Sequence, residues 1–417
     1  MGIPYPSQTS YGEKIGMKEI CSYDNCFGCS LCHDICPKNA ITIGCASGFW
    51  RPEIDSQKCV DCGLCKKNCP ANNISDAESL KRSAMHCYAS WSRDEQTHFH
   101  SASGGLAYEL SKCFIENGGC VAGCAFEDVS GTLTAKHVIV DTLTDLIKLS
   151  KSKYVHSNKD DIYKAVAEES KRRKVLFIGV SCEVFALYEY FKAGRHDITN
   201  VCTIHLLCRG GSSPFAMTRH LESLEKKYKK KISNVTFRGG EYNCQYVAYS
   251  GEEVIYRRGQ FEDEYFYGFM AHTLYQPVCY KCPFAEARRI SDITLADFQG
   301  LAQEIFVKAE GKGESLVLTH TEKGQELFDQ IKERLVIFER PFEESAKENT
   351  TLKEPTETHE ERERLWELIY KVGFEKAIHK VYWKWYAKLY TRKFVGKFWM
   401  LLPKTARMKI KKILRRG

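Results

Sequence analysis

The sequence predicts a chain of mixed α+β and α/β class, with a small cysteine-rich domain, a larger mixed α/β domain and a helical, basic C-terminal tail. Three observations support this. One cysteine pattern occurs twice before residue 71, helical and apolar strand patterns alternate from about residue 85, and residues 371–417 hold fifteen Lys or Arg against one acid. The expected boundaries are residues 20–75, 85–345 and 346–417.

The repeated cysteine pattern has the spacing Cys-x-x-Cys-x-x-Cys-x-x-x-Cys-Pro, which is typical of bacterial-type ferredoxins that bind two [4Fe–4S] clusters. In this pattern the fourth cysteine of each run binds the cluster of the other run. The first predicted ligand set is Cys26, Cys29, Cys32 and Cys69, and the second is Cys36, Cys59, Cys62 and Cys65. Zinc knuckles or disulfides are the alternatives, but zinc ribbons usually offer two CxxC pairs. We interpret residues 20–75 as a two-cluster ferredoxin domain with short strands at 40–43 and 51–55.

The charge of the chain is divided unevenly. The whole chain carries +8 and residues 371–417 carry +14, so the remaining residues carry −6. An acidic body disfavours a nucleic-acid-binding protein. The start has no apolar signal region, and no stretch is long and apolar enough to span a membrane, so a cytoplasmic location is expected.

The large domain shows alternating element types after a polar linker at 72–83. Helices are expected at 106–118 and 184–194, and strands at 119–127, 134–140, 174–180 and 200–208. The run KVLFIGV (174–180) is apolar between charged flanks, which is typical of a strand buried on both faces.

Two short motifs in this domain are candidate cofactor contacts. Small residues stand directly before the expected helix at 106, where backbone N–H groups could bind an anion: Ser101, Ser103, Gly104 and Gly105. An ordinary capped helix is the alternative. In KLSKSKYVHS, Lys151 and Lys153 could pair with phosphate and Tyr154 could stack on a ring, although a solvated basic loop also fits.

Four further cysteines could bind a third cluster if the ends of two strands converge. Two follow the strands at 174–180 and 200–208, and two form a CxxC pair; they are Cys182, Cys208, Cys279 and Cys282. Buried, inert thiols are the alternative.

The chain resembles the coenzyme F-420 hydrogenase/dehydrogenase beta-subunit family, fused to an N-terminal ferredoxin domain. The resemblance runs from about Cys26 to about Leu327. It rests on the order of seven segments: SASGG (101–105), SKYVHS (152–157), VLFIGVSCEVFAL (175–187), LLCRGGSSP (206–214), FRGG (237–240), the stretch from CYKCPF (279–284) to RRISDITLADFQG (288–300), and KGESLVLTHTEKG (312–324).

The resemblance implies FAD as a cofactor, with contacts from Ser101, Ser103, Gly104, Gly105, Lys153 and Tyr154. It also implies a third [4Fe–4S] cluster on Cys182, Cys208, Cys279 and Cys282. The chain departs from the family pattern beside two of these cysteines, with Glu183 after Cys182 and Arg209 after Cys208. Use of the deazaflavin coenzyme itself therefore stays open.

The expected function is that of an iron–sulfur flavoprotein oxidoreductase, in which electrons pass between the ferredoxin clusters, FAD and an organic hydride carrier or substrate. The alternative is a non-catalytic subunit that relays electrons to a partner enzyme. A partner protein such as ferredoxin and a small-molecule substrate are expected. The catalytic residue stays unknown, although His156, His205 and Arg209 are candidate proton donors.

The C-terminal tail combines a basic helical face with aromatic residues. Lys380, Lys384, Lys388 and Arg392 recur at i, i+4 spacing, with Tyr382, Trp385, Tyr386 and Leu389 on another face. This pattern is typical of a helix that lies on an anionic membrane surface. Packing of the aromatic residues on the protein body, or docking of an acidic ferredoxin, are the alternatives.

Overall fold

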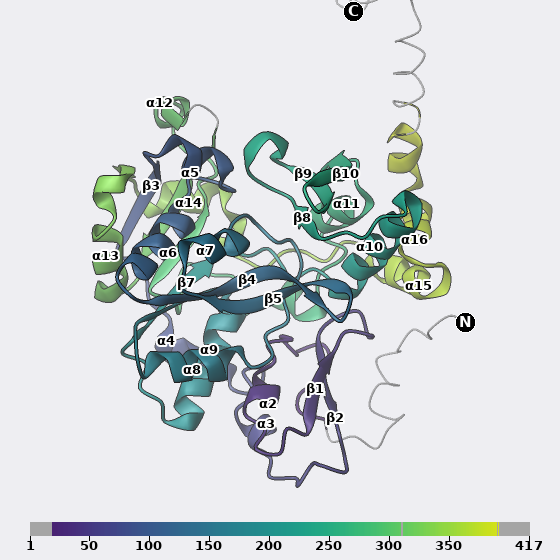
Figure 1. Ribbon diagram of the computed structural model, residues 1–417, viewed down its shortest axis with the longest axis horizontal. Coiled ribbons are helices and arrows are strands. Elements are labelled where there is room, and N and C mark those ends of the chain that lie inside the picture. The colour runs from purple at the N-terminus through teal and green to yellow at the C-terminus, as the bar shows by residue number, and fades with distance from the viewer. Residues whose placement is uncertain (1–18, 310–311, 390, 392–417) are drawn as a thin grey trace, which may run out of the picture. The chain divides into compact units, whose positions relative to one another are not determined.

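The computed structural model describes residues 19–309, 312–389 and 391. The described residues form two compact units, one up to residue 359 and the other from residue 360 onward. The larger unit contains the cysteine-rich part and the large domain (Figure 1).

The cysteine-rich part shows its internal repeat in its backbone. A short helix contains the third cysteine of each run, α2 (Leu31–Asp34) in the first half and α3 (Leu64–Lys67) in the second. Between them β1 (Ile41–Gly44) and β2 (Arg51–Ile54) pair as an antiparallel hairpin, as the sequence predicts. The helix α4 (Ile74–Leu80) leads into the large domain.

The large domain is built around a mixed sheet of eight described strands, in the order β13-β3-β12-β11-β7-β6-β4-β5. The central four, β11, β7, β6 and β4, run parallel, and the outer strands add antiparallel edges. The bounds are β3 (His86–Ser92), β4 (Cys120–Val129), β5 (Thr132–Val140), β6 (Val175–Gly179), β7 (Val201–Leu206), β11 (Ile293–Asp297), β12 (Ser315–Thr319) and β13 (Leu335–Glu339).

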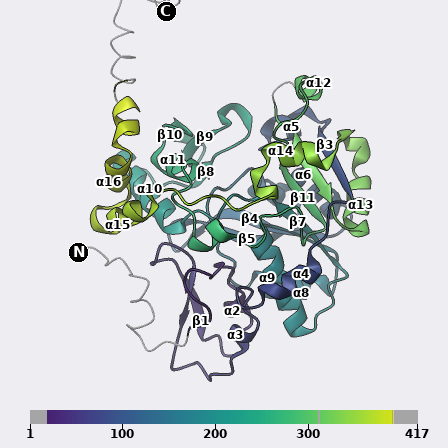
Figure 2. The same cartoon turned by 180° about the vertical axis from the view of Figure 1, so that it is seen from behind.

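Helices cover both faces of this sheet, which is why its central strands are apolar throughout. On β6, Leu176 and Ile178 pack with α6 (Leu106–Glu116), α7 (Leu143–Leu149) and α13 (Glu322–Asp329). Val175 and Phe177 point to the other face and pack with α8 (Ile162–Ser170) and α9 (Ser181–Gly194). Figures 1 and 2 show α6 on one side of the sheet and α8 and α9 on the other. The predicted α/β arrangement is confirmed.

A smaller layer completes the large domain. Three strands form an antiparallel sheet in the order β10-β9-β8: β8 (Asn234–Thr236), β9 (Gln245–Ser250) and β10 (Glu253–Gly259). Its helices are α10 (Pro214–Tyr228) and α11 (Glu264–Met270). The remaining elements are α5 (Glu95–His100), α12 (Gln303–Phe306), α14 (Phe342–Glu348), η1 (Gly240–Tyr242), η2 (Pro277–Lys281), η3 (Val307–Ala309), η4 (Lys332–Arg334) and η5 (Thr350–Leu352).

The second unit contains α15 (Arg362–Val372) and α16 (Phe374–Val381), followed by helical residues 383–389. Lys380, Lys384 and Lys388 of the predicted basic face are exposed, and Trp383 is 59% exposed. Arg392 lies outside the described residues. Within the described parts of the chain, every helix is too short or too polar to cross a bilayer.

Candidate functional site

The first thiol set consists of Cys26, Cys29, Cys32 and Cys69, and the fold brings these four cysteines together. Burial and the charges of Cys29, Cys26 and Cys69 raise the pKa of the Cys32 thiol well above its ordinary value. Backbone N–H groups already point at sulfur, since Gly28 N donates to Cys26 Sγ at 3.4 Å. Such N–H···S contacts suit iron-bound thiolates, whose potentials they tune.

A further cysteine, Cys21, lies within the first thiol set and was not predicted from the sequence. Hydrogen bonds with Cys26 and Cys69 raise its pKa above the usual thiol range. The hydrogen bond from Cys21 is in turn the main cause that lowers the pKa of Cys26, to about 6. The only sequence signal was its position, five residues before the repeated pattern.

The second thiol set consists of Cys36, Cys59, Cys62 and Cys65. Burial raises the pKa of Cys65, and the charges of Cys36 and Cys62 raise it further. Ala40 N donates to Cys36 Sγ at 3.3 Å. Cys62 is exposed, whereas Cys29 and Cys69 of the first set are buried. The second set therefore lies nearer to solvent.

The third thiol set consists of Cys182, Cys208, Cys279 and Cys282, and the fold brings these together as well. Cys182 lies at the start of α9 directly after β6, and Cys208 lies just beyond the end of β7. Burial, followed by the charges of Cys279 and Cys282, raises the pKa of Cys208 well above its ordinary value. Adjacent parallel strands end at the same edge, so the two strand-end cysteines meet the CxxC pair of η2.

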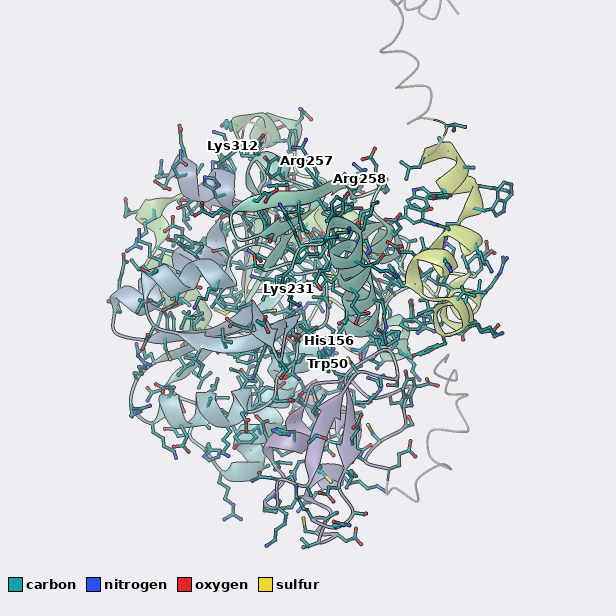
Figure 3. The ribbon with its side chains drawn as sticks, turned by 45° about the vertical axis from the view of Figure 1, so that its right-hand side comes forward. Trp50, His156, Lys231, Arg257, Arg258 and Lys312 are labelled. Carbon is teal, nitrogen blue, oxygen red and sulfur yellow. The ribbon has the colours of Figure 1, made fainter. Side chains whose placement is uncertain are left out.

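The cysteine-rich part packs against the third thiol set. Phe27, between Cys26 and Cys29, accepts a hydrogen bond from Gln276 Nε2 at 3.0 Å. Phe27 and Cys29 share a hydrophobic core with partly buried cysteines of the third set. Trp50 Nε1 donates to the carbonyl of His156 at 2.8 Å, and Figure 3 shows these two residues side by side where the parts meet.

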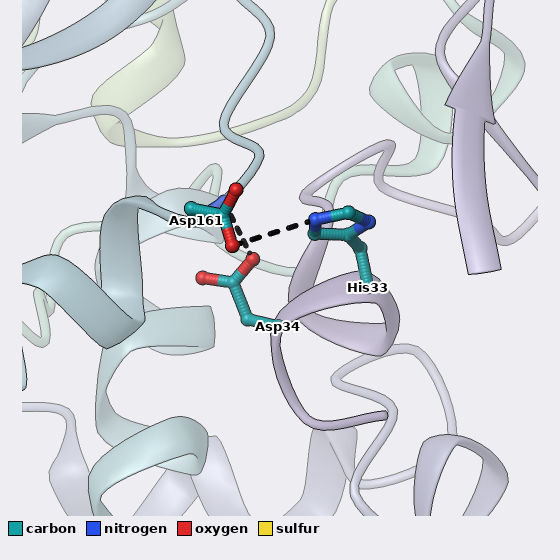
Figure 4. Close-up of side chains that lie close together, drawn as sticks. All are labelled: His33, Asp34 and Asp161. Atoms are coloured by element: carbon teal, nitrogen blue, oxygen red, sulfur yellow. Dashed lines mark hydrogen bonds and ion pairs between the residues drawn. The ribbon is translucent and has the colours of Figure 1, made fainter. Parts of the chain in front are cut away.

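A second contact fixes the same interface (Figure 4). The Asp34 carboxylate accepts backbone N–H groups of Asp161 at 2.8 Å, Tyr163 at 2.9 Å and Lys164 at 3.3 Å, at the start of α8. Burial raises the pKa of Asp34 to about 6, against these hydrogen bonds. His33 Nε2 lies 3.6 Å from Asp161 Oδ1. Because Asp34 caps α8, this group of side chains anchors α2 rather than presenting free ligand atoms.

A cavity of about 500 Å³ lies at the carboxyl ends of the parallel strands, where open α/β sheets commonly bind ligands. Five of the six predicted cofactor contacts line it: Ser101, Ser103, Gly105, Lys153 and Tyr154. Gly104 is not among the lining residues. It packs between strands, and a Cβ there would lie 2.4 Å from the Ser90 carbonyl oxygen. Cys208 of the third thiol set also lines the cavity.

Within the cavity the predicted contacts have specific partners. Lys153 Nζ donates to the carbonyls of Lys148 at 3.0 Å and Ser150 at 2.6 Å, and burial lowers its pKa to about 8. The Tyr154 ring stacks on Phe269 with centroids 4.5 Å apart. Ser103 Oγ is buried and has no hydrogen-bond partner within the described structure, so it has a free polar atom for a ligand.

The candidate proton donors differ in position. His156 and Arg209 line the cavity, whereas His205 is not among its lining residues. His205 Nδ1 lies 3.3 Å from Thr294 Oγ1 between β7 and β11, and burial lowers its pKa well below the ordinary value. This contact gives His205 a structural role in the sheet.

A buried ionic group beside the third thiol set was missed in the sequence. Glu183, directly after Cys182, lines the cavity and lies 3.0 Å from Lys159 Nζ, whose side chain has no exposed surface. Burial opposes the Glu183 charge, but Lys159, His137 and His156 together lower its pKa to about 2. Val180 N also donates to Glu183 at 2.9 Å. The available signal was Glu183 itself, one of the residues at which the chain departs from the pattern of the family it resembles.

Comparisons with known proteins agree with the two parts of this arrangement. Residues 25–73 match the family described as 4Fe-4S dicluster domain. Residues 172–345 match the family described as the C terminus of the coenzyme F420 hydrogenase/dehydrogenase beta subunit. No curated protein matches the chain.

Among solved structures, a chain of the F420-reducing [NiFe] hydrogenase complex from Methanosarcina barkeri is similar at 18% identity and a TM-score of 0.45. The match covers 65% of this chain and 90% of that one. By its two family matches, the chain is an iron–sulfur electron-transfer protein that joins a 4Fe-4S dicluster domain to a C-terminal domain of the coenzyme F420 hydrogenase/dehydrogenase beta-subunit family.

Proposed function

We propose that the chain is a flavin-dependent oxidoreductase that passes electrons between three [4Fe–4S] clusters, FAD and an organic hydride carrier or substrate. The observation that carries the proposal is the position of Cys208, which belongs to the third thiol set and also lines the cavity. A cluster held there would lie beside the cavity, where the substrate would bind.

The proposed cofactor ligands follow from the three thiol sets and the cavity. The clusters would supply one-electron transfer, and FAD would supply the exchange between one-electron and two-electron steps. The first set would hold the cluster nearest the large domain, and the second set the cluster nearest solvent. The cavity volume lies within the usual range of roughly 300–1,000 Å³ for ligand sites.

The chain's own residues would bind and orient the flavin. Ser103 offers a free hydroxyl, and Gly105, at φ 88°, leads into the positive end of the eleven-residue helix α6. Lys153 is held by backbone carbonyls and places a positive charge in the cavity wall. These groups would suit the pyrophosphate of FAD.

The proposal is tested by replacing Cys208 with Ser in anaerobically purified protein, with iron, sulfide and flavin quantified. We expect the iron content to fall by one cluster's share while the ferredoxin clusters stay loaded, because serine is a poorer ligand for iron. Cys244→Ser is the matched control, since Cys244 lines the same cavity but lies outside the three thiol sets. Unchanged iron in Cys208→Ser would remove the third cluster from the proposal.

The alternative is a non-catalytic subunit that relays electrons to a partner enzyme. The exposure of Cys62 supports it, because a cluster near the surface can exchange electrons with another protein. Flavin content with substrate turnover by the isolated chain favours the oxidoreductase, and clusters without flavin favour the relay.

We further propose that the second unit associates with an anionic membrane surface at the cytoplasmic face. Lys380, Lys384 and Lys388 are exposed on consecutive helical turns, and the exposed Trp383 suits the membrane–water interface. Vesicle co-sedimentation of the full chain and of a variant without these three lysine charges tests this.

A further inference from the structure

Arg51 is a buried cation at the place where the cysteine-rich part meets the large domain. It begins β2 and is 3% exposed. Its Nη1 donates to the carbonyl of Trp50 at 2.8 Å and to Gln276 Oε1 at 3.4 Å, and its Nη2 donates to the carbonyl of Tyr23 at 3.1 Å.

Arg51 lacks an acidic partner. Within the described residues, no carboxylate lies within ion-pairing distance of its guanidinium group, and its Nε is buried without a hydrogen-bond partner. The carbonyl groups and the Tyr23 ring, 4.5 Å away, stabilise the charge only in part. A buried charge is costly unless an opposite charge compensates it, so an anion is expected nearby.

The partners of Arg51 connect it to two thiol sets. Gln276, which accepts from Arg51, donates through its side chain to the carbonyl of Phe27, next to Cys26. The Gln276 carbonyl accepts from Cys279 N at 3.0 Å. Arg51 is therefore one hydrogen-bonded residue away from a cysteine loop of the first set and from the CxxC pair of the third set.

Cysteines of two thiol sets lie next to these hydrogen bonds. Cys26 directly precedes Phe27, whose carbonyl accepts from Gln276, and Cys279 donates its backbone N–H to the Gln276 carbonyl. In the loaded protein the sulfur atoms of Cys26 and Cys279 would be iron-bound thiolates of the proposed clusters.

We propose that Arg51 is the shared counter-charge of two iron–sulfur clusters, those of the first and third thiol sets, and that it makes both easier to reduce. One-electron reduction adds one negative charge and changes no bond or proton, so a fixed cation favours the reduced state. The half of the inference that concerns the third set rests on the proposed function. The cluster of the second set serves as an internal reference.

The test is an anaerobic redox titration of the full chain, followed by electron paramagnetic resonance, with dithionite as reductant. In Arg51→Met we expect the equilibrium constants for reduction of the first-set and third-set clusters to fall at least tenfold, which is about 59 mV for a one-electron couple. The second-set cluster keeps its potential, and Arg51→Lys restores most of the loss. Lys58→Met is the matched control, because it removes an exposed cation beside Cys59 whose charge water screens.

An unchanged potential of the first-set cluster in fully loaded Arg51→Met would overturn the proposal, and so would an equal shift of the second-set cluster. If Arg51→Met fails to load iron, Arg51→Lys is compared with Arg51→Gln, because only lysine keeps the positive charge. Equal reduction potentials of the first-set cluster in these two variants would overturn the proposal. A third cluster that is present but unshifted overturns the sharing. An iron content equal to two clusters, with a shifted potential of the first-set cluster, would contradict the proposed third cluster. It would still support the role of Arg51 at the first-set cluster.

Discussion

The protonation state of a side chain in this protein depends on its neighbours in space, and His320 is an example. It is 2% exposed at the end of β12, and its Nε2 lies 3.0 Å from Thr294 Oγ1. Burial lowers its pKa from the ordinary 6.5 to about 4. The folded protein therefore keeps His320 neutral at a pH where the unfolded chain binds a proton.

The depressed pKa of His320 predicts a pH dependence of stability. Its contribution is fully present above pH 6.5 and is lost as the pH falls toward 4, because the unfolded state takes up the proton first. Between pH 7 and pH 5 we expect wild type to lose about 2 kcal/mol more than His320→Gln in the free energy of unfolding. Denaturant unfolding at both pH values measures this, and parallel losses in the two proteins would contradict it.

The limits of sequence reasoning are also clearest for single residues. Spacing predicted the eight ferredoxin cysteines, because their pattern is local. Cys21 hydrogen-bonds Cys26 and Cys69 through the fold, and Lys159 reaches Glu183 across elements. Contacts of this kind leave no periodic signal. For Arg51 the sequence predicts only a place in a short strand, because its burial depends on how the cysteine-rich part docks on the large domain.

At the scale of elements, the internal repeat explains which positions need glycine. The two halves place positive φ at equivalent positions, Gly28 and Asp61 at 61° and 55°, and Ser30 and Gly63 at 62° and 72°. A Cβ on Gly28 would lie 3.0 Å from the Trp50 carbonyl oxygen and 3.1 Å from His156 Cε1. Position 28 of the docked half therefore needs glycine, because the docked neighbours leave no room for a side chain there, whereas the equivalent Asp61 is exposed.

The elements themselves were largely predictable. The expected strands at 174–180 and 200–208 correspond to β6 and β7, and the expected helix at 184–194 corresponds to α9. These elements are apolar and buried, so periodicity identifies them. The helix α9 begins three residues earlier than expected, because the Glu183 side chain accepts from Val180 N and extends its first turn.

The basic helix of the second unit gives a prediction at this scale. Each Lys near an anionic membrane adds about 1 kcal/mol of attraction. Replacing Lys380, Lys384 and Lys388 with Gln in the full chain should therefore weaken binding to phosphatidylserine vesicles by about 3 kcal/mol, roughly a hundredfold. Vesicle co-sedimentation measures this.

A triple Gln variant of exposed lysines near the end of α10, Lys226, Lys227 and Lys229, is the matched control for charge. It should bind vesicles like wild type. Equal binding by the variant of the basic helix and by wild type would show that these three lysines do not hold the protein at a membrane.

At the scale of the whole molecule, the order of the thiol sets suggests a direction along which electrons pass. The second set is nearest solvent, the first set packs on the large domain, and the third set reaches the cavity. The sequence predicted the members of each set but not this order. The order depends on the docking contacts of Asp34, Trp50 and Gln276, which join residues more than a hundred positions apart.

This order predicts that a partner redox protein docks beside the second thiol set. Lys66 and Lys67 are exposed in the last turn of α3, next to Cys65. Exposed basic residues beside the second thiol set suit an acidic ferredoxin, and charges of this kind act mainly on the association rate.

We expect Lys66→Gln/Lys67→Gln to lower the second-order rate constant for reduction by an acidic ferredoxin about tenfold at low salt, with iron content unchanged. The difference from wild type should vanish at high ionic strength, because salt screens exposed charges. Stopped-flow reduction under anaerobic conditions measures both. Lys226→Gln/Lys227→Gln, which removes an equivalent pair from the last turn of α10, should react like wild type. If both pairs slow the reaction equally, the partner responds to overall charge, and docking at the second thiol set is wrong.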